Sequence, residues 1–284
     1  MRFYSSNSNA LNYIMEEKLK EKYIHMEETN KKAGGFSGFI LLEEERWDKE
    51  QFKIDFAKDW DLEPIYEEGE STKEGDSDTD VVIMELNEQR VIFGYMGIPV
   101  PDGEAEDNAA YNYMWKDAVE VTKKHKAHMV VMIVGKHNDI MEDGELFVKV
   151  VSTLCKQENV IGVYTNGVVY EPKFYFAMKE CLRAGIFPIM GLVWFHMIRE
   201  ECGFSIYTIG MKNFGKDEME IIKVEENPVE VRDFLMEIAS YVILEDVTLC
   251  HGETIGLTEE HICKIIRSQG VYVGDMSLKI DYHK

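Results

Sequence analysis

The sequence predicts an α+β fold, with helices packed on a mostly antiparallel or mixed sheet. Two observations lead to this prediction. The chain opens with a strand, a helix and two further strands, which departs from the strict alternation of a doubly wound parallel sheet. Its last third contains two apolar runs, 192–199 and 204–210, joined by a short turn, so these runs should form an antiparallel hairpin. Pieces like the ferredoxin-like split βαβ are compatible with this order.

The first elements are a strand and a capped helix. Residues 36–42 form a short apolar run after glycines, which is typical of a strand. Asp48 can cap the helix that follows, and Gln51 stands three residues on, as in a capping box. The aromatic residues of that helix recur every fourth position and predict its buried face; they are Phe52, Phe56 and Trp60.

A hairpin and a long helix are expected next. Residues 81–86 and 90–97 alternate as strands do, with a tight turn at 87–88 between them. Asp102 or Gly103 then opens a long helix. Its apolar stripe is Tyr111, Met114, Trp115, Ala118 and Val121.

The middle of the chain predicts two strand–helix units. Residues 128–134 are a β-branched run expected to be covered on both faces, followed by a helix through 146–154. Residues 160–165 form the next strand. The helix after it should run from Pro172 to Gly185, because proline favours the first helical turn and glycine the position just past the end.

The last third is predicted to be rich in strands. After the 192–210 hairpin, residues 219–224 form a strand, and Asn227 can cap a helix. Short strands close the chain at 247–250, 270–273 and 277–281. The stretch 258–267 fits either a helical turn or a strand.

Two polar stretches suggest the domain organisation. Residues 1–35 are predicted to be a polar lead-in or linker that ends in Gly34–Gly35, and removal of residues 1–33 is expected to be tolerated. Residues 36–284 are predicted to form a single compact α+β domain, with a candidate sub-division near 186–191. Residues 67–78 have no apolar side chain to bury and are expected to be an exposed loop.

The charge restricts the classes of partner. The formal net charge is −22, from 53 acidic and 31 basic residues. Such a surface repels phosphate backbones, so direct nucleic-acid binding is not expected. A basic protein partner is one interpretation of this charge, and solubility alone is the other.

Hydropathy and cysteine usage predict a reducing compartment. No run reaches the roughly 18 apolar residues that span a bilayer, and no early apolar segment has signal-peptide length. We therefore expect a cytoplasmic protein without membrane association. The five cysteines are scattered and never paired as CxxC, so they should be reduced thiols, mostly buried.

No metal and no cofactor are expected from the motifs. HExxH, GxSxG and GxGxxG are missing from the sequence. His125 and His128 are three residues apart but straddle a predicted helix end and strand start, which is a poor arrangement for a metal. The segment 210–218 has an incomplete phosphate-loop spacing.

The densest candidate site lies where a strand ends and the long helix begins, within residues 99–115. Carboxylates near free helix N–H groups could serve a metal, a proton transfer or a cationic ligand, and residues four apart would share one face. The alternative is that the acids only stabilise the helix dipole, by about 0.3–1 kcal/mol each. The candidate ligand-binding residues are Glu104, Glu106, Asn108, Tyr111 and Asn112.

Several segments together resemble an uncharacterised bacterial family, the domain of unknown function DUF4261. They are Phe39–Leu42, Pro99–Trp115, Lys156–Asn159, Tyr164–Tyr175, Phe214–Glu220 and Gly252–Gly256. The resemblance covers roughly Phe36 to Asp281. It implies a bacterial cytosolic protein of one compact architecture, and it supplies no reaction, cofactor or catalytic residue.

Two functions remain as expectations. The first is a cytosolic, non-enzymatic binding protein, either an adaptor or an immunity-type factor for a basic protein partner, as the charge and the missing catalytic motifs suggest. The alternative is a small-molecule enzyme that uses Glu104 or Glu106 as general base. The sequence leaves the oligomeric state open.

Overall fold

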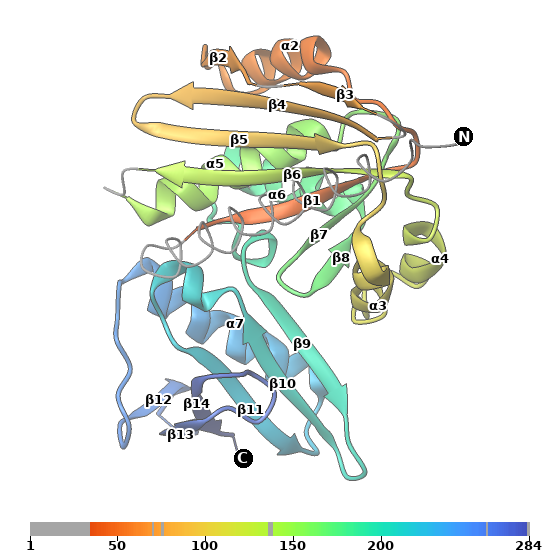
Figure 1. The fold of residues 1–284 in the computed structure, drawn as a ribbon. Coiled ribbons are helices and arrows are strands. Elements are labelled where there is room, and N and C mark those ends of the chain that lie inside the picture. The colour runs from red at the N-terminus through yellow and green to blue at the C-terminus, as the bar shows by residue number, and fades with distance from the viewer. Residues whose placement is uncertain (1–34, 70, 75–76, 136–138, 260, 283–284) are drawn as a thin grey trace, which may run out of the picture.

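The predicted α+β fold is confirmed in a computed structural model, which contains two mostly antiparallel or mixed sheets with helices packed on them (Figure 1). The structure describes residues 35–69, 71–74, 77–135, 139–259 and 261–282. The predicted lead-in falls outside these ranges, apart from Gly35. Its expected tolerance to removal therefore stays a prediction.

Sheet A forms the upper part of Figure 1 and has the order β2-β4-β5-β6-β1-β7-β8, with β3 also paired to β4. Every described strand pair in it is antiparallel. Its first strand lies in the middle, because Ile40 faces Met129 of β6 on one side and Val163 of β7 on the other. The strands are β1 (Ser37–Leu42), β2 (Ile65–Glu68), β3 (Thr72–Glu74), β4 (Ser77–Leu86), β5 (Gln89–Met96), β6 (Ala127–Gly135), β7 (Val160–Thr165) and β8 (Val168–Tyr170).

The expected exposed loop at 67–78 is partly wrong. β2 continues to Glu68, and β3 pairs with the start of β4 from Thr72 to Thr79. A strand at the edge of a sheet needs little apolar character, because its backbone hydrogen bonds go to the neighbouring strand. The polar side chains of this stretch therefore did not indicate that sheet A extends through it.

Three helices cover one face of sheet A: α2 (Lys49–Trp60), α5 (Ile140–Leu154) and α6 (Pro172–Arg183). The predicted cap of α2 is confirmed, because Asp48 accepts a hydrogen bond from Gln51 N. Phe52 and Phe56 are buried as predicted, and Phe52 meets Phe93 of β5 edge to face at 5.1 Å. This face holds the larger apolar core.

Two short helices cover part of the opposite face, α3 (Glu104–Ala109) and α4 (Ala118–Thr122). They pack over β7 and β8 on a smaller apolar cluster. The predicted single long helix is therefore wrong: it is two short helices separated by residues 110–117. Tyr111 and Met114, expected in a buried stripe, are 51% and 52% exposed.

Sheet B forms the lower part of Figure 1 and has the order β12-β13-β14-β11-β10-β9. The predicted hairpin is confirmed, and β11 pairs with β14 in parallel through a connection that contains α7. The elements are β9 (Trp194–Arg199), β10 (Phe204–Ile209), β11 (Glu218–Val224), α7 (Pro228–Leu244), β12 (Thr254–Thr258), β13 (His261–Gln269) and β14 (Met276–Asp281).

The close of the chain is corrected in three places. Residues 247–250 and 270–273, expected as strands, lie outside any strand. The undecided stretch 258–267 falls mostly in strand β13. Residues 270–273 carry apolar side chains but do not extend sheet B. Their backbone instead donates a hydrogen bond from Tyr272 N to the Glu220 carboxylate of β11.

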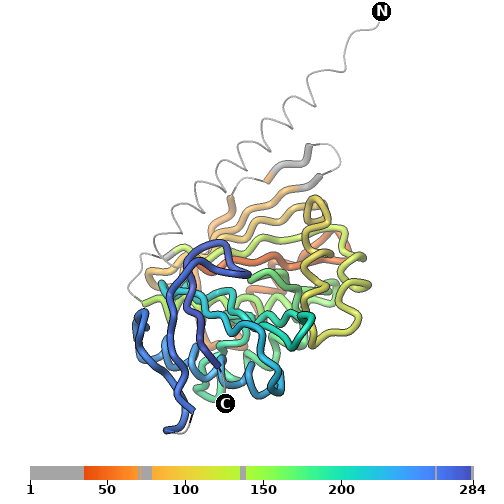
Figure 2. Tube along the Cα trace, turned by 90° about the horizontal axis from the view of Figure 1, so that it is seen from below, coloured from red at the N-terminus to blue at the C-terminus, as the bar shows by residue number. Residues whose placement is uncertain are grey.

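The chain passes from sheet A to sheet B between residues 184 and 193, where a sub-division was predicted. One buried apolar cluster continues from sheet A through Trp194 and Phe195 to α7. Across the join, Asn166 of the β7–β8 turn donates a hydrogen bond to Leu192 O. Seen from below, α3 and α4 (yellow) lie to one side of sheet B (blue) (Figure 2).

The five cysteines are all free, as predicted. Only Cys155 and Cys263 are buried, however, and Cys202 and Cys250 are exposed. Among the described residues, no helix combines the length and the apolar character that a membrane span requires.

Candidate functional site

The five predicted site residues are distributed over α3 and the segment that follows it. Glu104, Glu106 and Asn108 lie within α3, and Tyr111 and Asn112 come after its end. The expected face that joins Glu104, Asn108 and Asn112 at helical spacing therefore does not exist. Asn108 donates its amide hydrogen to Glu104 O at 2.8 Å, which closes the last turn of α3.

The two glutamates point to different elements. Glu104 Oε1 accepts a hydrogen bond from the Tyr164 hydroxyl of β7 at 2.6 Å. Burial and this carboxylate raise the pKa of Tyr164 above its usual range. Glu106 Oε1 lies 3.7 Å from His125 Nδ1, beyond hydrogen-bonding distance. The carboxylates do not converge on one ligand.

His125 is held as a neutral imidazole beside Glu106. Its Nδ1–H donates to Thr122 O at 2.6 Å, and its Nε2 accepts from Val100 N at 2.9 Å. A backbone carbonyl and a backbone amide together fix this tautomer, because the two ring nitrogens must then play opposite roles. Glu106 Oε2 is buried and has no hydrogen-bond partner among the described residues.

Asn112 fixes the backbone between α3 and α4. It is 8% exposed, and its Nδ2 donates to Val169 O of the edge strand β8 at 2.8 Å. Its Oδ1 accepts from Met114 N at 2.9 Å. The Asn112 side chain therefore binds the backbone at the edge of sheet A, and the helix does not continue through this residue. The apolar spacing alone could not indicate this contact.

The residues around Asn112 form an exposed apolar surface. Tyr111, Tyr113 and Met114 are 51%, 40% and 52% exposed, although exposed large apolar side chains rarely gather in one short segment. Next to them is a hollow of about 350 Å³. We call this region the 109–119 surface, and its hollow is lined by Ala109, Ala110, Asn112–Lys116, Ala118 and Val119.

Two of the exposed rings rest on sheet B. Tyr113 stacks on Trp194 of β9 with ring centroids 5.0 Å apart, and Tyr111 meets His196 edge to face at 5.7 Å. Burial raises the pKa of Tyr113, and a hydrogen bond with Arg232 acts in the opposite direction. These contacts hold the two rings against sheet B.

The row of rings continues across sheet B. His196 stacks on Tyr207 at 4.7 Å, and Tyr207 stacks on Tyr272 at 5.3 Å. Burial lowers the pKa of His196 to about 4, against the opposing effect of its hydrogen bond to Asn166 O at 3.2 Å. This row was not predicted from the sequence. Its only signal was the alternation of Trp194 and His196 along one strand.

Two buried carboxylates hold the loops of sheet B. Glu218 accepts hydrogen bonds from Thr208 Oγ1 at 2.6 Å and from Gly210 N at 2.9 Å. These bonds fix the segment 210–218, whose spacing is that of an incomplete phosphate loop. Glu220 is fully buried and accepts from Tyr272 N at 2.7 Å. Burial alone would raise the pKa of Glu220, but Lys279 and the hydrogen-bond donors around it hold that pKa below its usual value.

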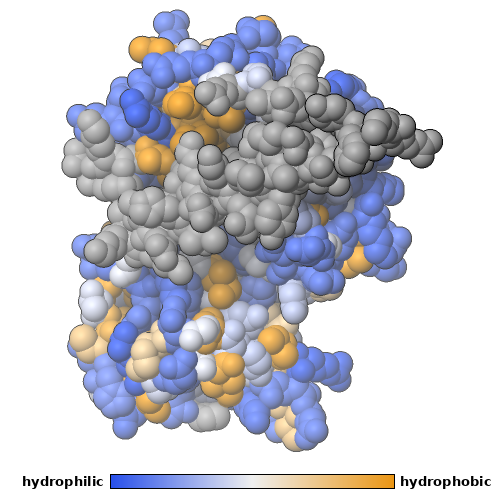
Figure 3. Space-filling view, viewed as in Figure 1, coloured by the Kyte–Doolittle hydropathy of each residue, from blue (hydrophilic) through white to orange (hydrophobic). Residues whose placement is uncertain are grey.

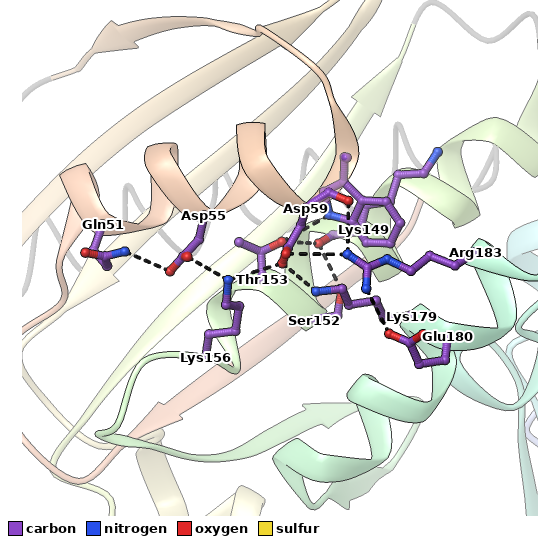
Figure 4. A network of polar contacts seen from close by, with 11 residues as sticks. Gln51, Asp55, Asp59, Lys149, Ser152, Thr153, Lys156, Lys179, Glu180 and Arg183 are labelled. Atoms are coloured by element: carbon purple, nitrogen blue, oxygen red, sulfur yellow. Dashed lines mark hydrogen bonds and ion pairs between the residues drawn. The ribbon is translucent and has the colours of Figure 1, made fainter.

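A further charged cluster joins α2, α5 and α6 (Figure 4). The Asp59 carboxylate is only 9% exposed and lies 2.6 Å from Lys179 Nζ and 3.4 Å from Lys156 Nζ. Three cations lie 5.8–5.9 Å from the centre of the Trp60 ring. The charges are matched within the network, so we assign it to holding the three helices together.

Metal ligation is a poor fit to the described part of the chain. Within it, no three His, Cys, Asp or Glu side chains come together in a way that could hold a metal ion. His125 and His128, the pair considered from the sequence, each use Nδ1 on a backbone carbonyl.

Comparison with known families gives one match. Residues 207–281 match the model of DUF4261, a domain of unknown function. The match confirms the resemblance over the part from the second half of β10 to β14, which includes α7, Glu218, Glu220 and Tyr272. No curated protein and no solved structure matches the chain.

Proposed function

We propose that this protein is a cytosolic, non-enzymatic binding protein, an adaptor or an immunity-type factor, whose 109–119 surface docks a basic protein partner. The observation that carries the proposal is the exposure of Tyr111, Tyr113 and Met114 on a segment fixed from below by Asn112. Tyrosine and methionine are enriched in protein interfaces. Ordered rings also lose little entropy when a partner binds.

The charge around this surface favours a basic partner. From Asp102 to Thr122 the chain has six acidic residues and one basic residue, Lys116. Asp102, Asp107 and Asp117 are exposed beside the apolar rings. An apolar centre with a charged rim is the usual anatomy of a protein interface, and the acidic rim would steer a basic partner during encounter.

The test is a matched pair of double variants. Tyr111→Ala with Met114→Ala should weaken binding of the partner captured from cell extract at least tenfold. Tyr241→Ala with Leu244→Ala is the control, because these α7 side chains are exposed to a similar extent, 49% and 54%. Affinity is measured by calorimetry at two salt concentrations, and the higher salt should weaken wild-type binding. Equal loss in both double variants would contradict the proposal.

One observation favours the second candidate, a small-molecule enzyme with Glu106 as general base. Glu106 Oε2 is buried, with no hydrogen-bond partner in the described ranges. Glu104, its companion in the sequence hypothesis, already accepts a hydrogen bond from Tyr164. Glu106→Gln separates the two candidates, because it should leave partner affinity unchanged if the 109–119 surface is the functional one.

A further inference from the structure

The hollow of the 109–119 surface has a lining of small apolar side chains beside large ones. Ala109 and Ala118 are only 1% and 2% exposed, and Ala110 and Val119 complete the small members of the lining. The large members are Tyr113, Met114 and Trp115. Small residues next to large exposed ones leave a depression, because no side chain fills the volume above the alanines. The local sequence of this segment therefore creates the hollow.

The polar groups of this lining are already in use or carry positive charge. The Asn112 amide is committed to two backbone groups. Three carbonyls of the lining accept backbone hydrogen bonds, and they belong to Ala109, Asn112 and Trp115. Lys116 is the charged side chain of the lining. A cationic group inside the hollow would lose its water without gaining a strong acceptor, so the hollow favours an apolar occupant.

The size of the hollow suits one aromatic side chain. Its volume is about 350 Å³, whereas an apolar protein cavity of about 150 Å³ holds a benzene ring. A phenyl or indole ring therefore fits. Tyr113 and Trp115 in the lining also favour a ring, because aromatic pairs attract each other beyond the effect of apolar burial.

The chain around the hollow is acidic. Asp117 stands between two lining residues, and Asp107 comes two residues before the first of them. Both are exposed and, within the described ranges, form no ion pair, whereas Glu120 pairs with Lys123 at 3.1 Å. Figure 3 shows the surface over α3 and α4 as mostly hydrophilic (blue). These carboxylates favour positive charge on either side of the occupant.

We propose that the hollow receives an aromatic side chain, phenylalanine or tryptophan, from a protein segment that carries lysine or arginine on both sides of the ring. The ring enters the apolar hollow, and the flanking cations stay outside it near Asp107 and Asp117. The partner of the function proposed above, on which this assignment rests, is then a basic segment built around an aromatic anchor. A buried aromatic anchor surrounded by weaker polar contacts is the usual form of an interface hot spot.

Peptides with blocked ends test this chemistry directly. The probe is Lys-Lys-Phe-Lys-Lys, and it is compared with Lys-Lys-Ala-Lys-Lys and Glu-Glu-Phe-Glu-Glu. In NMR titrations of the full chain, the probe should shift the methyl signals of Ala109, Ala118 and Val119, because a ring in the hollow lies beside them. The alanine peptide should bind about tenfold more weakly, since it lacks the anchor. The glutamate peptide should also bind about tenfold more weakly, since its charges are repelled.

A matched pair of variants locates the site on the protein. Ala110→Phe fills the hollow with a ring of the protein itself and should weaken binding of Lys-Lys-Phe-Lys-Lys about tenfold. Ala184→Phe is the control, because Ala184 is likewise an exposed alanine at the C-cap of a helix and lies outside the hollow. This control should bind the probe as the wild type does. Amide spectra show whether each variant is folded.

Three results would overturn the assignment. The alanine peptide could bind as tightly as the probe, the glutamate peptide could do so, or Ala110→Phe and Ala184→Phe could have equal effects. The peptide comparison uses the wild-type protein, so it decides the question even if Ala110→Phe does not fold.

The same variants separate this assignment from the proposed function. If Tyr111→Ala with Met114→Ala weakens binding of the captured partner but Ala110→Phe does not, the surface docks its partner without the hollow, and the assignment is wrong. If the probe needs the hollow but the double variant keeps full affinity for the partner, the hollow is a site for basic aromatic segments, and the proposed docking function is wrong.

Discussion

At the scale of single residues, the two acids of the candidate site have separate structural partners. Glu104 serves Tyr164 of β7, and Glu106 lies against the neutral ring of His125. Both readings made from the sequence, a convergent site and a pure dipole effect, leave these contacts out. The contacts are between residues about 20 and 60 positions apart, which one-dimensional spacing does not encode.

The hydrogen bond from Tyr164 to Glu104 is expected to contribute about 1 kcal/mol to stability. Glu104→Gln should lower the free energy of unfolding by that amount, and Tyr164→Phe by a similar amount. The double variant should cost less than the sum, because both changes remove one interaction. Urea unfolding of the four proteins measures this coupling. Strict additivity would mean that the two side chains do not interact in solution.

At the scale of elements, local signals predicted most helices and strands. Asp48 and Asn227 cap α2 and α7 as expected, and Pro172 begins α6. The prediction failed where a long-range contact overrides spacing: Asn112 binds the edge of β8 and divides the expected long helix. Of the candidate site, Tyr111 and Asn112 could be found from the sequence, but their exposed and buried states could not.

The contact of α2 with α5 and α6 rests on the Asp59 network. Asp59→Ala should destabilise the fold by about 3 kcal/mol, because it leaves the nearly buried ammonium of Lys179 without its closest partner. Asp59→Ala with Lys179→Met should be less destabilised than Asp59→Ala alone. Chemical denaturation gives the three values.

The control for this prediction is an ion pair of the surface. Glu120 and Lys123 are 77% and 56% exposed, so Glu120→Ala should change stability by less than about 0.5 kcal/mol. A cost for Asp59→Ala no larger than this would show that the network is solvated and carries little of the helix packing.

At the scale of the whole molecule, the two sheets meet at a histidine. His196 of sheet B donates to Asn166 O in the β7–β8 turn of sheet A, and Tyr111 rests on its ring. The β7–β8 turn contains Asn166–Gly167, whose φ angles are 53° and 69°. The contact of this turn with His196 could not be predicted, because β9 belongs to the other sheet and lies about 30 residues further along the chain.

The burial of His196 between the two sheets should make the stability of the protein depend on pH. The pKa of His196 is lowered to about 4 in the folded protein, from 6.5 when unperturbed. Below pH 6.5 the unfolded chain therefore binds more protons, and stability falls as the pH drops towards 4. Between pH 7.5 and pH 5 the wild type should lose about 2 kcal/mol more than His196→Phe, which keeps the ring stacking.

Thermal and urea unfolding at both pH values give this difference. The other histidines and the carboxylates titrate in both proteins, so they cancel in the comparison. Equal losses in the wild type and in His196→Phe would mean that the His196 ring is accessible to protons in the folded state.

The central position of β1 has a consequence for how the chain is made. Among the described strands β1 is the first to leave the ribosome, but its partners are residues 127–132 and 160–164. At about 5–20 residues per second, roughly 6–25 s of synthesis separate β1 from the end of β7. Throughout that interval β1 offers two unsatisfied edges with apolar side chains, which is the condition under which nascent chains aggregate. Sheet A can therefore close around β1 only after more than half of the residues have been synthesised.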